Sequence, residues 1–342
     1  MKTGMPSLND VAEQAGVSKS TVSRILNNRL GNGFSVKEDV RLRVIDVAKK
    51  LNYRPNLIAK SLTMRSTKMI HIFGGNHALS ELGNIYQTVV NNITQIIDSQ
   101  TEGFDVTVDM SCHKTEDSEM PAWKIDGAII LAKCTDRTME EIVQMEIPYV
   151  VINGACPAGG FSVVPDDIGG TRKALAYLRE LGHTKIAYSG PLAPFLAGHS
   201  SIRDRHDTYI SEMKNHGLAT LFGSQEYLDS AESFMKETVL DKGATAILAY
   251  GHMGALNLLQ AAHSMDISVP DQVSIICFCD EYANRIMSPG LSFIDLCSAK
   301  MGALAADLLL KQIRGTKKIS PQHLVLEETL QIRGTTAPPY RK

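Results

Sequence analysis

The chain opens with two short amphipathic patterns that have the spacing of α-helices. The first starts at Ser7, and Asp10 three residues later completes a plausible capping signal. Its apolar residues share one helical face: Leu8, Val11, Ala12 and Ala15. Gly16 ends this pattern and Ser18 is a good N-cap for a second helix, so only a tight turn separates the two.

The second helix has an apolar side and a polar side. Val22, Ile25 and Leu26 share the apolar side, and the opposite side is polar and basic: Lys19, Ser20, Ser23 and Arg24. Two short helices about a glycine turn, the second with such an outer face, are typical of a helix-turn-helix unit. Its early residues would enter the major groove of DNA, where Lys19 and Arg24 can donate to guanine edges or to phosphates.

A third amphipathic pattern runs from about residue 37 to residue 51 and closes a small three-helix core. Its inward residues are Val40, Val44, Val47, Ala48 and Leu51. Pro55 cannot continue this helix, and Asn56 is a fair N-cap for a new one. The pattern leaves open whether residues 56–63 form a short helix or a flexible linker, because so short a helix is unstable alone.

From residue 69 onward, short apolar runs alternate with helical patterns. The expected strands are 69–73, 106–109, 127–131, 149–152, 185–189, 246–249 and 273–277, and helical patterns between them include 168–181, 202–216 and 255–263. Such alternation predicts parallel βαβ units and doubly wound sheets. The predicted fold is an all-α helix-turn-helix head followed by an α/β body of two lobes with a cleft between them.

Charge separates these two parts. Residues 1–68 hold 13 Lys and Arg against 5 Asp and Glu, a net charge of +8, so the other residues carry −10 of the total of −2. A basic head on an acidic body points to a polyanion partner for the head alone. Charge alone does not distinguish such a partner from a solvated basic face.

Composition and motifs exclude several classes of protein. We expect a cytoplasmic chain that binds no membrane, because residues 1–10 lack the apolar run of a signal peptide and no stretch of 18 apolar residues occurs. The six cysteines show no C-x-x-C pair and no disulfide-framework spacing. We also expect no enzyme, cofactor or metal site, because dinucleotide, P-loop, nucleophile-elbow and metal-ligand spacings are all missing.

The head closely resembles that of the lactose-repressor (LacI/GalR) family of transcriptional regulators. The resemblance rests on residues 8–27 (LNDVAEQAGVSKSTVSRILN) and 51–56 (LNYRPN), followed by Ile58, Ala59 and Leu62. It implies that 56–63 fold on DNA and that Leu62 enters the minor groove as a wedge. The implied DNA-binding residues are Ser18, Lys19, Ser20, Thr21, Ser23, Arg24, Asn27, Tyr53, Asn56, Ala59 and Leu62. The loop at 28–35 is longer than the family usually has.

The body also resembles this family, at residues 178–187 (LRELGHTKIA), 190–192 (GPL) and 268–274 (SVPDQVS). The resemblance implies a head at 1–54, a hinge at 55–68 and a periplasmic-binding-protein-like sensor at 69–337. Lobe one would comprise 69–165 with 296–324, and lobe two 166–295 with 325–337. The family is dimeric through its body and binds its effector between the lobes.

The implied effector residues depart from the family pattern. Arg205 matches the family's effector-binding arginine, which could hold two hydroxyls or a carboxylate. The usual Asn-Asp pair is replaced by Gly251 and His252, and the usual Gly-aromatic-Asp-Asp by residues 277–280, which place Cys279 before Asp280. A neutral sugar held in the usual way is therefore disfavoured, while an altered sugar, a sugar phosphate, another metabolite or a weakened response stays open.

The function predicted is an effector-gated repressor of carbohydrate or related metabolic genes. A homodimer would bind an inverted-repeat operator in double-stranded DNA, with a small-molecule effector, a sugar or related metabolite, in the body. The alternatives are a metabolite-binding protein of the cytoplasm and a corepressor-dependent regulator with a non-sugar effector. The sequence leaves open whether the protein represses or activates.

Overall fold

The computed structural model describes residues 6–26, 35–53, 66–79, 84–101, 103–110, 119–157, 160–191, 199–223, 230–280, 290–315 and 320–340. The chain divides into two compact units, Met1–Thr67 and Lys68–Lys342, which we call the head and the body and treat separately. Among the described residues, no helix has both the length and the apolar character needed to span a bilayer.

The head contains the three helices that the sequence predicts: α1 (Leu8–Ala15), α2 (Lys19–Leu26) and α3 (Glu38–Lys50). The capping signal at Ser7 is confirmed, because its hydroxyl accepts from the Asp10 amide and its own amide donates to the Asp10 carboxylate. Gly16 ends α1 with a φ of 66°, a conformation that favours glycine. The buried core of the head is small: Val11, Ala12, Ala15, Val22, Ile25, Val44, Val47 and Ala48.

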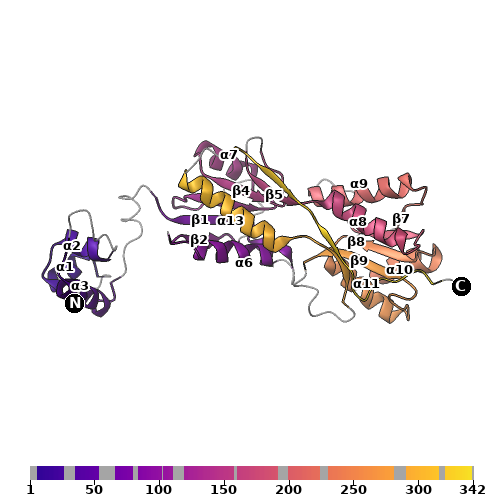
Figure 1. Cartoon of the computed structure of the whole chain (residues 1–342), viewed down its shortest axis with the longest axis horizontal. Coiled ribbons are helices and arrows are strands. Elements are labelled where there is room, and N and C mark those ends of the chain that lie inside the picture. The colour runs from indigo at the N-terminus through magenta and orange to yellow at the C-terminus, as the bar shows by residue number, and fades with distance from the viewer. Residues whose placement is uncertain are drawn as a thin grey trace. The chain divides into compact units, whose positions relative to one another are not determined.

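The first sheet of the body is parallel throughout, in the order β11-β5-β4-β3-β1-β2. Its strands are β1 (Met69–Phe73), β2 (Asp105–Val108), β3 (Gly127–Leu131), β4 (Tyr149–Ile152), β5 (Ser162–Pro165) and β11 (His323–Leu326). The helices of this lobe are α5 (Asn76–Leu79), α6 (Ile85–Asp98), α7 (Asp136–Gln144) and α13 (Ser298–Arg314). α13 packs beside α6, although some 200 residues separate them in the chain (Figure 1).

The second sheet has the order β12-β10-β9-β8-β6-β7, and only β12 runs antiparallel to its neighbour. Its strands are β6 (Ile186–Ser189), β7 (Leu221–Phe222), β8 (Ala246–Ala249), β9 (Ser274–Cys279), β10 (Ser292–Asp295) and β12 (Thr329–Gln331). Its helices are α8 (Asp167–Glu180), α9 (Ser200–Asn215), α10 (Ala231–Met235), the π-helix η2 (Lys236–Asp241) and α11 (His252–Ser264). All seven predicted strands are present, within two residues at each end.

Three crossing segments join the two sheets. They follow β5, β10 and β11, and the last of them runs from one lobe to the other near the C-terminus (Figure 1). The Asp166 amide of the first segment donates to the carbonyl oxygen of Leu326, the last residue of β11, at 2.9 Å, and the Cys297 thiol of the second donates to the Glu327 carbonyl of the third at 3.4 Å. The third crossing begins after Leu326, whereas the sequence placed the change of lobe at 324–325. The crossing segments therefore form one connected hinge region.

Candidate functional site

The outward face of α2 is the first candidate site. Val22 and Ile25 anchor the helix in the core of the head, which leaves Ser18, Lys19, Ser20 and Arg24 exposed and Thr21 and Ser23 half-buried. Ser18 caps the helix, because its hydroxyl accepts from the Thr21 amide at 3.1 Å. The same oxygen lies 2.8 Å from the hydroxyls of Ser20 and Thr21. The face thus presents an ordered row of hydroxyls beside two long cationic side chains.

Tyr53 has a different environment from the other predicted DNA-binding residues. Its ring is half-buried against the core of the head, its amide donates to the Ala48 carbonyl, and burial raises the pKa of its hydroxyl. Tyr53 therefore packs against the core of the head at the end of α3. Four further predicted residues lie outside the described part of the chain: Asn27, Asn56, Ala59 and Leu62.

The second candidate site is a cavity of about 280 Å³ between the two lobes of the body. Polar side chains from both lobes line it: Asn84, Tyr86 and Asn153 from the first, and His199, Ser201, Arg205, Tyr250 and His252 from the second. Apolar contacts come mainly from Ile85, Ala132, Met253, Phe278 and Leu296. A small cavity with convergent polar groups is the usual form of a site for a small molecule.

Arg205 is the most strongly held side chain of this cavity. Its Nε donates to the Asp167 carboxylate at 2.6 Å and its Nη1 to the Tyr250 carbonyl at 2.7 Å. Its guanidinium carbon lies 3.9 Å from the centre of the Phe278 ring. Both members of the ion pair are buried, so the charge of Arg205 is balanced inside the protein and its geometry is fixed.

A hydrogen-bond network joins the two lobes across the cavity. The His199 Nε2 donates to the Asn153 carbonyl at 2.6 Å, and its Nδ1 accepts from the Ser201 amide at 3.2 Å. The Ser201 hydroxyl bonds to the Asn153 side chain, whose amide donates to the Tyr86 hydroxyl at 3.0 Å. Burial lowers the pKa of His199, which keeps the imidazole neutral and able to donate from one nitrogen and accept at the other.

The structure divides the predicted effector residues among three places. Arg205, Gly251 and His252 line the cavity between the lobes. A Cβ atom added at Gly251 would meet no atom within 4 Å, so the missing side chain leaves open space there. Cys279 differs from the prediction: it is fully buried in the core beside α11, because alternate residues of β9 face opposite sides and Phe278 takes the side of the cavity.

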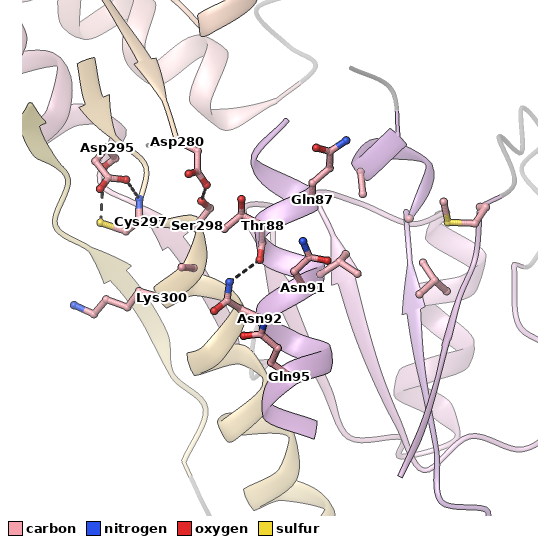
Figure 2. A pocket seen from close by; sticks show the side chains of 16 residues that line it. Gln87, Thr88, Asn91, Asn92, Gln95, Asp280, Asp295, Cys297, Ser298 and Lys300 are labelled. Carbon is pink, nitrogen blue, oxygen red and sulfur yellow. Dashed lines mark hydrogen bonds between the residues drawn. The ribbon is translucent and has the colours of Figure 1, made fainter. Parts of the chain in front are cut away.

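Asp280 also differs from the prediction, because it lines a second and larger cavity of about 890 Å³ on the body. Figure 2 shows this cavity between α6, which contributes Gln87, Thr88, Asn91, Asn92 and Gln95, and the start of α13. The Asp280 carboxylate accepts from the Ser298 hydroxyl, and the Asp295 carboxylate accepts from the Cys297 amide at 2.9 Å. Asp280 thus holds the N-terminus of α13.

Several residues of the inter-lobe cavity were not predicted from the sequence. Asn153 and Tyr250 each follow directly after a parallel strand, β4 and β8, and ligands of such sheets bind beyond the carboxyl ends of the strands. A search of the residues after each predicted strand would have found both. His199 and Tyr86 had no such signal, because they come from the start of α9 and from the first turn of α6.

Metal chemistry has no evident site in the part of the chain that the structure describes. No group of three or more His, Cys, Asp or Glu side chains there lies close enough together to hold an ion.

Two family models match the sequence. Residues 7–56 match the lacI family of bacterial regulatory proteins, and residues 175–336 match a periplasmic binding protein-like domain. The first match covers the described helices α1 to α3, and the second covers β6 to β12, which include α13 and β11 of the first lobe.

Curated relatives and solved structures match along most of the chain. The probable transcriptional repressor ExuR of Bacillus subtilis is 26% identical, covering 90% of this chain and 92% of the relative. The repressor PurR of Haemophilus influenzae is 28% identical, covering 90% and 91%. A crystal structure of the lac repressor dimer bound to operator and an anti-inducer superposes with a TM-score of 0.77 at 23% identity, covering 98% and 100%. A complex of the transcriptional regulator CelR with cellobiose gives a TM-score of 0.64 at 23% identity, covering 96% and 99%.

Proposed function

The chain belongs to the LacI family of bacterial regulatory proteins, and on this premise we propose that the head binds DNA under the control of an effector bound in the body. The protein is a sequence-specific DNA-binding transcriptional regulator, and its relatives named above are regulators and not enzymes. We further propose that it represses carbohydrate or related metabolic genes and acts in the cytoplasm, where it meets its operator.

In this proposal, the α2 face reads the major groove. Lys19 and Arg24 donate to guanine O6 and N7 or to phosphates, while Ser20 donates and accepts at base edges. Support comes from the exposed, capped helix, which meets DNA without having to fold first. Asn56, Ala59 and Leu62 would follow the family's minor-groove contact.

The operator would be an inverted repeat read by a homodimer. A solved relative with a similar fold is a dimer bound to operator. Two heads related by a twofold axis require two half-sites related by the same symmetry. The spacing of the half-sites would then report the distance between the heads on DNA.

The effector would be a small polar molecule held in the inter-lobe cavity, a sugar or related metabolite. The observation that carries this proposal is the convergence of amide, hydroxyl, imidazole and guanidinium groups from both lobes on one cavity. Asp167 already balances the charge of Arg205, so a ligand without net charge fits better than an anion. The open space beside Gly251 would accept a substituent that the usual side chain excludes.

The experiment that tests the DNA-binding function is selection from a random DNA library, followed by sequencing of the retained fragments. The expected result is one palindromic site. Retention without any sequence preference would contradict direct, effector-independent operator recognition by this protein.

Substitutions at cationic residues of α2 and α3 sharpen this test. Arg24→Ala is expected to weaken binding to the selected site by about 1–3 kcal/mol if Arg24 contacts a base, with a smaller loss on random DNA. The matched control is Lys49→Ala with Lys50→Ala, which removes two charges from the exposed end of α3 and not from α2. Equal losses on both DNAs would assign Arg24 to a phosphate instead.

A further inference from the structure

Glu328 lies in the third crossing segment, between β11 and β12, and its environment is unusual for a carboxyl group. The residue is completely buried, with 0% of its surface exposed. Neither of its carboxyl oxygens has a hydrogen-bond partner among the residues that the structure describes. An ionised carboxylate in such a place would lose its hydration without compensation.

The surrounding chain is shaped to admit this side chain. Gly170, in the first turn of α8, leaves the necessary space, because a Cβ atom there would come within 1.7 Å of a Glu328 carboxyl oxygen. The Lys173 ammonium holds the backbone in place, since it donates to the Glu328 carbonyl at 2.7 Å and to the Glu327 carboxylate at 2.6 Å. Glu327 therefore points to solvent and Glu328 points into the hinge region.

The charges that face Glu328 are mostly negative. Arg205 is the cation that acts on the Glu328 carboxyl group, and its shortest bond goes to Asp167 rather than to Glu328. The titratable and charged groups around it come from α8, α9, β10 and the segment after β10: Asp166, Asp167, Lys173, Arg205, Asp295 and Cys297. Burial, the largest cause, raises the pKa of Glu328 well above its usual range; Arg205 opposes this as the next largest effect, and the nearby carboxylates raise the pKa further.

We propose that Glu328 is a proton-binding residue of the inter-lobe hinge, neutral in the arrangement of the lobes seen here and ionised when the hinge opens. Opening would expose the carboxyl group to water or bring it to the guanidinium of Arg205, which has an N–H group to offer. Proton release and hinge opening are then linked, and Glu328 acts through Arg205 as a positioning residue of the effector cavity.

The direction of the effect follows from linkage. We call the arrangement of the lobes seen here the closed hinge. A group that binds its proton more tightly in the closed hinge stabilises that state at low pH and loses this contribution as pH rises. Between the ordinary pKa of a glutamate and the raised pKa of Glu328, each pH unit changes the ratio of closed to open molecules by up to tenfold. A ligand that needs both lobes would accordingly bind more weakly at higher pH, a consequence that rests on the proposed function.

Three measurements on the full-length protein test whether Glu328 carries a proton, how it changes the stability of the body with pH, and whether the hinge opens as pH rises. None of them needs an effector. Infrared spectra at neutral pH should contain the carbonyl stretch of a buried carboxylic acid that Glu328→Gln lacks. Unfolding of the body, followed by Trp123, should show that Glu328→Gln matches the unchanged protein near pH 5 and exceeds it at pH 8. Amide hydrogen exchange at 163–170 and 324–331, corrected for intrinsic rates, should accelerate with pH in the unchanged protein only.

Glu327→Gln is the matched control, because it removes a neighbouring carboxylate that is exposed and paired with Lys173. It should keep the infrared band and the pH slope of the unchanged protein. Absence of the band from the unchanged protein would overturn the proposal, as would equal pH slopes in Glu328→Gln and the unchanged protein. A changed slope of unfolding without any change in exchange at the crossing segments would make Glu328 a buried proton site with no role in the hinge, which also overturns it. Failure of the operator selection would leave these outcomes unaffected.

Discussion

The head and the body present their candidate sites in opposite ways. In the head, the polar residues lie on the exposed side of one helix, and the core beneath it contains eight buried residues among those that the structure describes. In the body, Arg205, Asn153 and His199 are gathered from separate elements of two lobes, and Arg205 has 4% of its surface exposed. One site depends on local helix geometry and the other on the tertiary structure of two sheets.

This difference in solvent exposure determines how much an ion pair contributes to stability in each region. Exposed ion pairs in the head, such as Arg41 with Glu38, exchange one hydrated state for another and contribute little. The buried pair of Arg205 and Asp167 has lost its water, so each partner depends on the other. The Arg41–Glu38 pair in the head is therefore hydrated, whereas the Arg205–Asp167 pair in the body is desolvated.

The largest effect should come from breaking the buried pair. Arg205→Ala leaves Asp167 buried and unpaired, and should lower the free energy of unfolding of the body by about 3–5 kcal/mol. Arg41→Ala in the head should cost about 0–1 kcal/mol. The measurement is guanidinium denaturation, with Trp123 fluorescence for the body, since this is the one tryptophan of the chain, and circular dichroism for the helical head.

The double variant Arg205→Ala with Asp167→Ala checks the reason for this loss. It should recover much of the stability, because no charge is then left without a partner. A double variant no more stable than Arg205→Ala would show that packing of the guanidinium against Phe278 and Tyr250, and not the unpaired carboxylate, explains the loss.

The same comparison explains what the sequence could predict. The pattern of Val22 and Ile25 against Lys19 and Arg24 defines the α2 face, because helical period alone decides which residues are exposed. In the body, the strands with continuous apolar runs were predicted. Strands β5, β7, β10, β11 and β12 were missed: β7 and β12 have only two and three residues, β5 and β10 each begin with a serine, and β11 exposes its first and third residues.

The site in the body was predicted only in part, for a tertiary reason. Arg205 was found by resemblance, but its pairing with Asp167 joins residues 38 positions apart on two helices, and no local spacing encodes it. Cys279 was assigned to the cavity by its position in a motif. The side of β9 on which it lies depends on which face of the sheet meets α11, and that is a property of the folded lobe.

The next largest effect should come from removing the same buried atoms from the small core of the head and from the larger core of the body. Ile25→Ala in the head and Ile129→Ala in the body remove the same atoms from sites that are 5% and 0% exposed. Each should cost about 2–5 kcal/mol. A small domain has little stability to lose, so Ile25→Ala should unfold the head and abolish DNA binding, whereas the body should stay folded with Ile129→Ala. A folded, DNA-binding Ile25→Ala head would mean that contacts beyond its own core stabilise it.

The smallest expected effect is a difference between the body and the head in how their stability depends on pH. All ten histidines of the chain lie in the body, and burial lowers the pKa of His71, His183 and His199. For such groups the unfolded chain binds protons more readily than the folded one. Their contribution to stability is therefore present above the ordinary histidine pKa of about 6.5 and is lost as pH falls below it. The head, which has no histidine, should keep its stability over this range.

His199 should account for part of this acid sensitivity, because protonation removes the acceptor that its Nδ1 offers to the Ser201 amide. A hydrogen bond of this kind contributes about 0.5–1.5 kcal/mol, so His199→Gln should lower stability by this amount near pH 7.5 and reduce the loss on acidification. The comparison is best made in the Glu328→Gln background, because Glu328 stabilises the body toward low pH and would oppose the histidine effect. If the double variant loses as much stability between pH 7 and pH 5 as Glu328→Gln alone, then His71 and His183 carry the acid sensitivity, and the hydrogen bonds between the lobes are independent of protonation in this range.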